Sequence, residues 1–201
     1  MTTIIDYGAG NPASILNMLK RVGEDSVITS DPLAVKDAER LILPGVGSFD
    51  YGMSMLREKG LAEELSNKVL KEKTPVLGIC LGLQLMALNS EEGSADGLGW
   101  IKVRVVRFRD TGLIIPHMGW NKITMRKKSR LFEDLQGDSR FYFVHSYFSE
   151  CQDSDDILAV SVYGHEFTCA VEKDNILGVQ FHPEKSHNFG MKVLKNFCQY
   201  Y

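Results

Sequence analysis

The spacing of apolar residues in the first half of the chain does most to limit its fold. Short apolar runs of strand length alternate there with segments in which apolar residues recur at helical spacing. This alternation predicts a parallel sheet built from strand–helix units, because parallel neighbours need a crossover connection. The expected strands are Thr3–Asp6, Val27–Thr29, Leu41–Leu43 and Val76–Ile79.

Helix signals lie between these expected strands. Asn11 and Pro12 supply an N-cap and a first-turn proline for a helix that Gly23 ends. Asp31 followed by Pro32 opens another helical turn. Further helices are expected around residues 53–56, 61–70 and 81–88.

After Gly99 the pattern of apolar residues changes to short runs, some of which alternate with polar residues. Such runs favour mixed or antiparallel strands joined to the same core. A final helix is expected to pack through Phe189, Val193, Leu194 and Phe197. The strands expected in this half are residues 103–108, 122–125, 141–144, 157–162, 169–171 and 176–180.

Composition limits the partners and the setting of the chain. Its 201 residues, 44% of them hydrophobic, fit one domain over residues 1–201, and a net charge of −3 disfavours nucleic acid as a partner. We expect no membrane span, because no apolar stretch reaches the ~20 residues that one needs. The N-terminus lacks the features of a secretory signal, so a cytoplasmic location is expected. The four cysteines have no CxxC spacing and are expected to be reduced.

Residues 78–82, Gly-Ile-Cys-Leu-Gly, have the form of a nucleophile elbow with Cys80 in place of serine. A sharp turn between strand and helix strains the backbone, and the flanking glycines let neighbouring backbone pass close by. The helix that follows offers its N-terminal end and the Leu81 N–H to a thiolate or an oxyanion. A buried core cysteine between two packing glycines fits this motif equally well.

A second motif favours the catalytic interpretation. His182-Pro-Glu184 directly follows the expected strand at 176–180, so an imidazole stands at the end of that strand. A histidine there can act as a general base for Cys80, and a nearby carboxylate can orient the imidazole. Cys80, His182 and Glu184 are therefore the predicted catalytic triad.

The segment Pro44-Gly-Val-Gly47 follows the third expected strand and should lie at the same sheet edge as Cys80. Its two glycines would let backbone N–H groups turn toward a ligand. An ordinary β-turn is the alternative interpretation.

Taken together, Gly78–Gln84 and Phe181–Glu184 resemble the class I glutamine amidotransferases. This resemblance runs along the whole chain. It implies an α/β fold: a flavodoxin-like mixed sheet with helices on both faces, plus a smaller, more antiparallel second sheet in the C-terminal half. More narrowly, residues 6–11, 44–47, 116–121 and 143–147 resemble the glutaminase subunits of imidazole glycerol phosphate synthases.

The resemblance implies a mechanism for L-glutamine hydrolysis without a cofactor or metal. Cys80 attacks the side-chain amide, His182 protonates the departing ammonia and then activates water, and Glu184 orients His182. One oxyanion donor is the backbone N–H of Leu81, and the other comes from a peptide that has to flip. The residues implied in oxyanion and substrate binding are Val46, Gly47, Leu81, Gln84, Ser146 and Tyr147.

The resemblance also implies a partner. Ammonia would pass to a (βα)8-barrel cyclase subunit, docked as a heterodimer, which makes imidazole glycerol phosphate and AICAR in histidine biosynthesis. Trp120 is expected to be an exposed aromatic anchor, because no alternating pattern places it within a strand. The residues that correspond to the docking face are Asn11, Trp120, Tyr142 and Lys185.

Two alternative functions would use the same cysteine nucleophile. Residues 12–13, 99–100 and 185–190 depart from the usual pattern and are similar to a paralogous branch, whose ammonia goes to amidation of a surface-polysaccharide sugar. A stand-alone cysteine hydrolase would use the same triad, although Gln84 and the segment 116–121 are superfluous to it.

Other activities have weaker signals. Residues 8–13 fit a G-x-G-x-x-A fingerprint for a dinucleotide, with Asp31 near the position of the ribose-binding acid. A metal site through His182, Glu184 and His187 has poor spacing, and no metal is expected. The remaining histidines, which are His117, His145 and His165, are expected to be hydrogen-bonded structural residues, the first two near the site.

Overall fold

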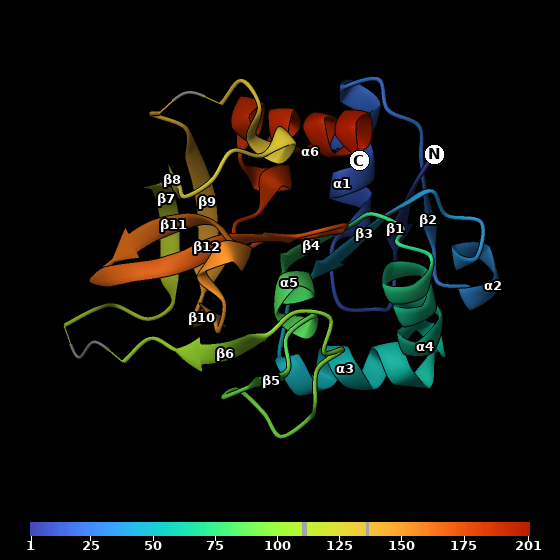
Figure 1. Ribbon diagram of the computed structural model, residues 1–201, viewed down its shortest axis with the longest axis horizontal. Coiled ribbons are helices and arrows are strands. Elements are labelled where there is room, and N and C mark those ends of the chain that lie inside the picture. Colours follow the sequence, from blue (N-terminus) through green and yellow to red (C-terminus); the bar gives the residue numbers. More distant parts are fainter. Residues whose placement is uncertain (110–111, 136) are drawn as a thin grey trace.

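The computed structural model describes residues 1–109, 112–135 and 137–201. A central sheet crosses the molecule between two layers of helices (Figure 1). Part of this sheet is parallel throughout, with the strand order β2-β1-β3-β4-β13. This order is that of flavodoxin-like folds. The five strands are β1 (Thr2–Ile5), β2 (Ser26–Thr29), β3 (Arg40–Gly45), β4 (Val76–Cys80) and β13 (Ile176–Val179).

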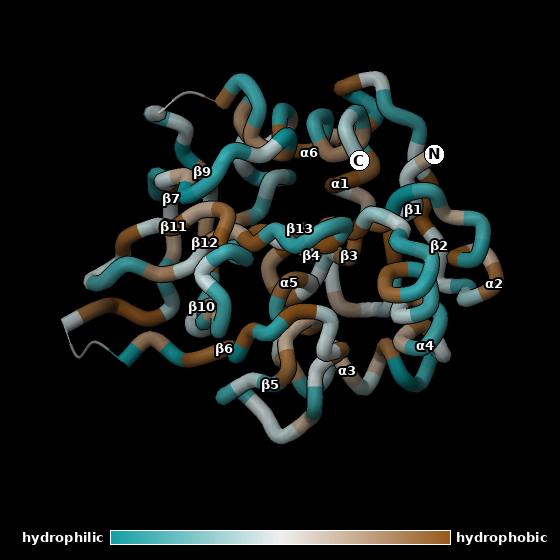
Figure 2. The backbone as a smooth tube through the Cα atoms, in the orientation of Figure 1, coloured by the Kyte–Doolittle hydropathy of each residue, from teal (hydrophilic) through white to brown (hydrophobic). Residues whose placement is uncertain are grey.

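Helices cover both faces of the parallel strands (Figure 1). On one face, Ile15, Leu19 and Phe197 belong to one buried apolar cluster, and on the other Phe49 and Leu65 belong to a second. Figure 2 shows apolar residues where α1 and α5 approach the strands and hydrophilic residues along the outer loops. The helices are α1 (Pro12–Arg21) and α6 (His187–Tyr200) on the first face, α3 (Phe49–Glu58), α4 (Leu61–Ser66) and α5 (Leu81–Leu85) on the second, and α2 (Pro32–Val35) beside β2.

The predicted helix ends are confirmed by their hydrogen bonds. The side chain of Asn11 accepts from the Ser14 N–H at 3.2 Å, and that of Asp31 accepts from the Leu33 N–H at 2.9 Å. Gly23 follows the last turn of α1 with a φ of +80°, the left-handed conformation that glycine adopts without strain. These ends are determined by residues adjacent in sequence.

The second half of the chain continues the sheet in antiparallel fashion. Strand β12 pairs with β13, then β10 and β6 follow, all antiparallel, and β5 closes this edge in parallel with β6. Strand β11 pairs with both β12 and β8, while β7 and β9 form a separate antiparallel pair. The predicted fold class is therefore confirmed. These strands are β5 (Asn89–Ser90), β6 (Val103–Arg107), β7 (His117–Lys122), β8 (Thr124–Met125), β9 (Arg140–His145), β10 (Tyr147–Cys151), β11 (Ile157–Tyr163) and β12 (His165–Lys173).

The predicted helix over 81–88 is too long, because α5 ends at Leu85. The carbonyl of Met86 accepts from the Trp100 N–H at 2.9 Å, and that of Ala87 accepts from the Gly99 N–H at 3.0 Å. Pairing with a distant loop therefore replaces the helical hydrogen bonds. Shorter helical turns complete the structure at Asn67–Lys71, Arg130–Phe132, Ser154–Asp156 and Pro183–Lys185.

The predicted strand over 122–125 is also wrong, because the chain changes sheets at Ile123. Strand β7 ends at Lys122 and pairs with β9, whereas β8 begins at Thr124 and pairs with β11. Trp120 consequently lies within β7, against the sequence expectation that it stands outside a strand. Its side chain is nevertheless 46% exposed, as expected of an anchor.

The carboxyl ends of β3, β4 and β13 lie side by side, because β4 pairs with both of the others. This edge receives the loop after β3, Cys80 at the end of β4, and the segment that leads from β13 to His182. All four cysteines are free thiols. No helix within the described ranges is both long enough and apolar enough to cross a membrane.

Candidate active site

Cys80 stands at the turn between β4 and α5 with a φ of +54°, a conformation that side-chain-bearing residues rarely adopt. The glycines of the elbow make this turn possible. A Cβ on Gly82 would lie 1.7 Å from the Leu43 carbonyl oxygen, and one on Gly78 would lie 2.8 Å from the Leu83 Cα. Both neighbours are backbone atoms, so the two positions require glycine. The predicted elbow geometry is confirmed.

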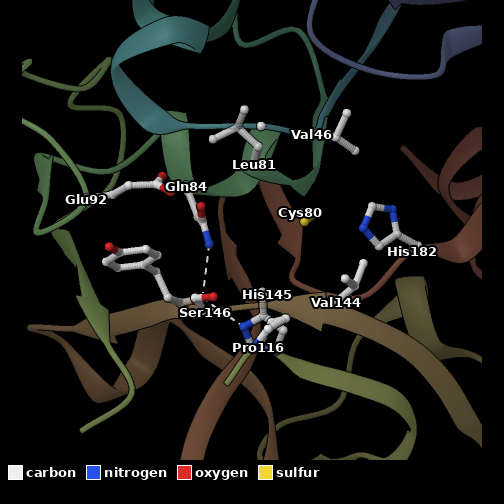
Figure 3. A pocket seen from close by; sticks show the side chains of 12 residues that line it. Val46, Cys80, Leu81, Gln84, Glu92, Pro116, Val144, His145, Ser146 and His182 are labelled. Atoms are coloured by element: carbon white, nitrogen blue, oxygen red, sulfur yellow. Dashed lines mark hydrogen bonds between the residues drawn. The ribbon is translucent and has the colours of Figure 1, made fainter. Parts of the chain in front are cut away.

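A cavity of about 300 Å³ opens in front of the Cys80 sulfur (Figure 3). The predicted oxyanion and substrate residues all line it, together with Cys80 and His182, although they come from distant parts of the sequence. Glu184 lies behind His182 rather than in the wall. The lining residues are Val46, Gly47, Cys80, Leu81, Gln84, Glu92, Pro116, Val144, His145, Ser146, Tyr147 and His182.

The side chains of His182 and Glu184, which are 2% and 7% exposed, form a pair at 2.7 Å between Nδ1 and Oε1. The other ring nitrogen, Nε2, is buried without a hydrogen-bond partner among the described residues, and Figure 3 places the ring beside Cys80. Burial by itself disfavours the imidazolium, but contacts with Cys80 and Glu184 outweigh it and raise the pKa of His182 to about 10. A histidine oriented by a carboxylate therefore lies beside the Cys80 sulfur.

Gln180 is a polar residue of the site that sequence reasoning missed. Its fully buried side chain donates from Nε2 to Cys80 Sγ at 3.6 Å and accepts from Gln84 Nε2 at 3.1 Å. The same Gln84 amide donates to the Tyr147 carbonyl at 3.1 Å. Two-residue alternation along an extended segment would have placed Gln180 on the same side as His182.

In the loop after β3, one backbone N–H is hydrogen-bonded to a residue outside the cavity wall. The Val46 N–H donates to the carbonyl of Ala9 at 3.2 Å. Gly47 follows with a φ of +104°, and apart from its chain neighbours no described atom lies within 4 Å of a Cβ built there. The Val46 N–H is therefore already bonded, whereas the position of a Gly47 side chain is open.

Three of the four predicted docking residues meet around Tyr142, whose carbonyl accepts from the His182 N–H at 2.9 Å. Trp120 contacts the edge of Tyr142 at 6.1 Å between ring centroids, and Lys185 Nζ lies 5.6 Å from the centre of the Tyr142 ring. His187, which was not predicted here, stacks on Trp120 at 5.2 Å with an interplanar angle of 6°. Within the described part of the chain, Asn11 has no hydrogen bond or ring contact with this group and serves as the N-cap of α1.

The residues of the possible dinucleotide and metal sites, and the remaining histidines, make other contacts in the structure. Asp31, the acid of the dinucleotide fingerprint, caps α2. His187, the third residue of the possible metal site, stacks on Trp120. His117 and His145 are hydrogen-bonded to each other at 3.1 Å, whereas His165 is exposed.

At the edge of a flavodoxin-like sheet, the elbow cysteine stands beside a histidine that is paired with a carboxylate, the arrangement that nucleophilic catalysis by a cysteine requires. The chain belongs to the class-I glutamine amidotransferases, whose family description it matches over residues 3–200.

Individual sequence relatives indicate a more specific group of proteins within this family. The chain is 54% identical to the imidazole glycerol phosphate synthase subunit HisH 2 of Methanococcus maripaludis over 200 residues, which cover 99% of each chain. It is 50% identical to the subunit HisH 2 of Pseudomonas aeruginosa, again over 99% of each chain. Among solved structures, a glutamine amidotransferase superposes with a TM-score of 0.75 at 19% identity, covering 97% of this chain and 98% of the other. This structural similarity supports the assignment of the fold.

Proposed function

We propose that this chain is the glutaminase subunit of an imidazole glycerol phosphate synthase, a single-domain cytoplasmic enzyme of histidine biosynthesis. It hydrolyses L-glutamine to glutamate and ammonia. The observation that carries this proposal is the meeting of Cys80 and the paired His182 and Glu184 at one cavity, in a chain with full-length relatives named as HisH subunits.

The proposed reaction begins with attack of the Cys80 thiolate on the side-chain amide carbon of glutamine. The carbonyl oxygen becomes an oxyanion that the Leu81 N–H receives at the start of α5. His182 gives its Nε2 proton to the amide nitrogen, the carbon–nitrogen bond breaks, and ammonia leaves a thioester on Cys80. His182 then takes a proton from water, which attacks the thioester and releases glutamate. Glu184 holds the imidazole in place through Nδ1.

The oxyanion needs a second donor, and we assign this to the backbone of Val46 and Gly47. The Val46 N–H is bonded to the Ala9 carbonyl in the present state. A peptide group of this loop therefore has to rotate before its N–H can face the oxyanion. Gly47 has a φ of +104° and no side chain, so it can adopt backbone conformations that other residues cannot, which favours this rotation. An isolated chain in this state should hydrolyse glutamine slowly.

The proposed partner is a (βα)8-barrel cyclase subunit that docks over the cavity and receives the ammonia. Trp120, Tyr142 and Lys185 lie together at the surface beside the site and offer the partner an aromatic face with one cation. Asn11 belongs to the same proposed surface through its position at the start of α1.

The test compares glutamine hydrolysis by the purified chain with and without a barrel subunit carrying its acceptor. We expect the partner to raise the rate at least ~100-fold, the effect of placing one oxyanion donor. Full activity of the chain alone would instead support a stand-alone hydrolase. Native co-purification then distinguishes the acceptors, because capture of a sugar-amidating synthase would assign the chain to the surface-polysaccharide branch.

A further inference from the structure

Three side chains form a chain of hydrogen bonds that the glutaminase mechanism does not use; it begins behind the cavity wall and ends at His145 in the wall itself. Asn121 Nδ2 lies 3.4 Å from His117 Nε2, and His117 Nδ1 lies 3.1 Å from His145 Nε2. His145 Nδ1 lies 2.7 Å from the carbonyl oxygen of Tyr147. Both imidazoles are buried, with 3% of His117 and 6% of His145 exposed.

These contacts permit one placement of the protons. The Tyr147 carbonyl can only accept, so His145 carries its proton on Nδ1 and accepts at Nε2. His117 must then donate from Nδ1 and accept at Nε2 from the Asn121 amide. The orientation of that amide is fixed independently, because its nitrogen donates to the Val162 carbonyl and its oxygen accepts from the Lys122 N–H, both at 2.8 Å.

The surroundings keep both imidazoles neutral. Burial lowers the pKa of His117 to about 4, and burial lowers the pKa of His145 to about 3 although its bond to the Tyr147 carbonyl acts in the opposite direction. A second proton on His145 would turn an N–H toward the N–H of His117. Because this contact would be repulsive, the neutral pair is the stable arrangement.

Stacking holds the rings in the orientation that these bonds require. The His117 ring lies between Tyr163, at 4.1 Å and 23°, and Phe143, at 5.0 Å and 24°. Neighbouring aromatic rings on both sides restrict rotation of the imidazole. The donor at Nδ1 is therefore aimed at His145 before any substrate binds.

The last link of the chain reaches the substrate side of the cavity. The Tyr147 carbonyl accepts from His145 and also from Gln84 Nε2, so two donors fix its direction (Figure 3). Ser146 and Tyr147 line the cavity. A fixed Tyr147 carbonyl restricts the backbone torsion between the Cα and the carbonyl carbon of Tyr147, and so restrains the backbone that leads to both residues.

We propose that His117 and His145 are positioning residues of the glutamine site, which as neutral Nδ1–H tautomers hold the backbone of residues 146–147 in its substrate-binding orientation. This inference rests on the proposed glutaminase function. It adds two residues that act through the Tyr147 carbonyl and do not touch the reacting atoms.

The first experiment is nitrogen-15 NMR of the histidine rings in the wild-type chain, which distinguishes the two neutral tautomers. We expect both His117 and His145 to be neutral at neutral pH with the proton on Nδ1. A proton on Nε2 of either ring would overturn the proposal. This measurement does not depend on enzyme activity, so it is separate from the test of the glutaminase function.

The second experiment measures glutaminase kinetics of variants in complex with the barrel subunit. His117→Phe keeps a ring in the aromatic stack but removes the donor to His145, and we expect KM for glutamine to rise about tenfold with a smaller change in kcat. His117→Asn returns an amide N–H to the Nδ1 position and should recover most of the loss. An unchanged KM in His117→Phe would refute the positioning role.

His165→Phe is the matched control, because His165 contacts the same aromatic cluster through Phe108 but is exposed and outside the hydrogen-bonded chain. Melting curves confirm that each variant is folded. A wild-type complex that fails to hydrolyse glutamine would disprove the proposed function instead, while the tautomers would still be read from the NMR spectra.

Discussion

Replacement of Trp120 by alanine tests the proposed docking surface most directly. The side chain is 46% exposed, and a tryptophan has up to ~250 Å² of surface, so about 115 Å² is left for a partner to cover. At about 25 cal/mol per Å², burial of that area contributes roughly 3 kcal/mol to binding. Trp120→Ala should therefore weaken binding of the barrel subunit about 100-fold.

The structure also predicts an effect on the isolated chain. The covered half of Trp120 packs on His187 and Tyr142, and its loss should lower the free energy of unfolding by about 2 kcal/mol, roughly half the value for a core tryptophan. For a chain of this length that corresponds to a fall of about 4–8 °C in Tm. A Trp120 side chain that was free of the rest of the chain would leave Tm almost unchanged, so the stacking on His187 is the reason for the expected fall.

Titration calorimetry against the barrel subunit, well below the lowered Tm, measures the affinity of folded protein only. Leu33→Ala is the control, because Leu33 is 67% exposed on α2, at the far end of the sheet from β7 (Figure 1). An unchanged Kd in Trp120→Ala, with the fall in Tm, would refute the docking argument and leave Trp120 as a packing residue.

Three further predictions concern the site. Cys80→Ala should abolish glutamine hydrolysis while the melting curve stays close to wild type, because it removes the sulfur and little volume; residual turnover by purified protein would exclude the triad. Glu184→Gln should lower the pKa of His182 from about 10, as followed by NMR titration. Because the raised pKa stabilises the fold fully below about pH 6.5 and loses effect toward pH 10, the Tm difference from wild type should shrink over that range. Gly82→Ala would place a Cβ 1.7 Å from the Leu43 carbonyl oxygen, and we expect a loss of about 3 kcal/mol in urea unfolding, whereas a normal midpoint would mean that the elbow can relax.

The sequence by itself determined the features that depend on neighbours in the chain. Asn11 and Asp31 cap helices through bonds to residues two or three positions ahead, and Gly23 supplies a positive φ where α1 ends. The apolar period distinguished strands from helices, and the spacing of Gly78, Cys80 and Gly82 predicted the strained turn. Each of these is a local requirement that few other residue types can meet.

Tertiary structure alone decided the features that depend on distant partners. Helix α5 ends at Leu85 because the next carbonyls bond to residues 99–100, and the chain leaves one sheet for another at Ile123. Gln180 and the bonded pair of His117 and His145 became visible as parts of the site only when the strands were aligned. The side chain of His117 bonds to a residue 28 positions away in the sequence, and that of Gln180 bonds to one 100 positions away. Periodicity can say which face a residue occupies, but which donor meets which acceptor depends on strand order and register.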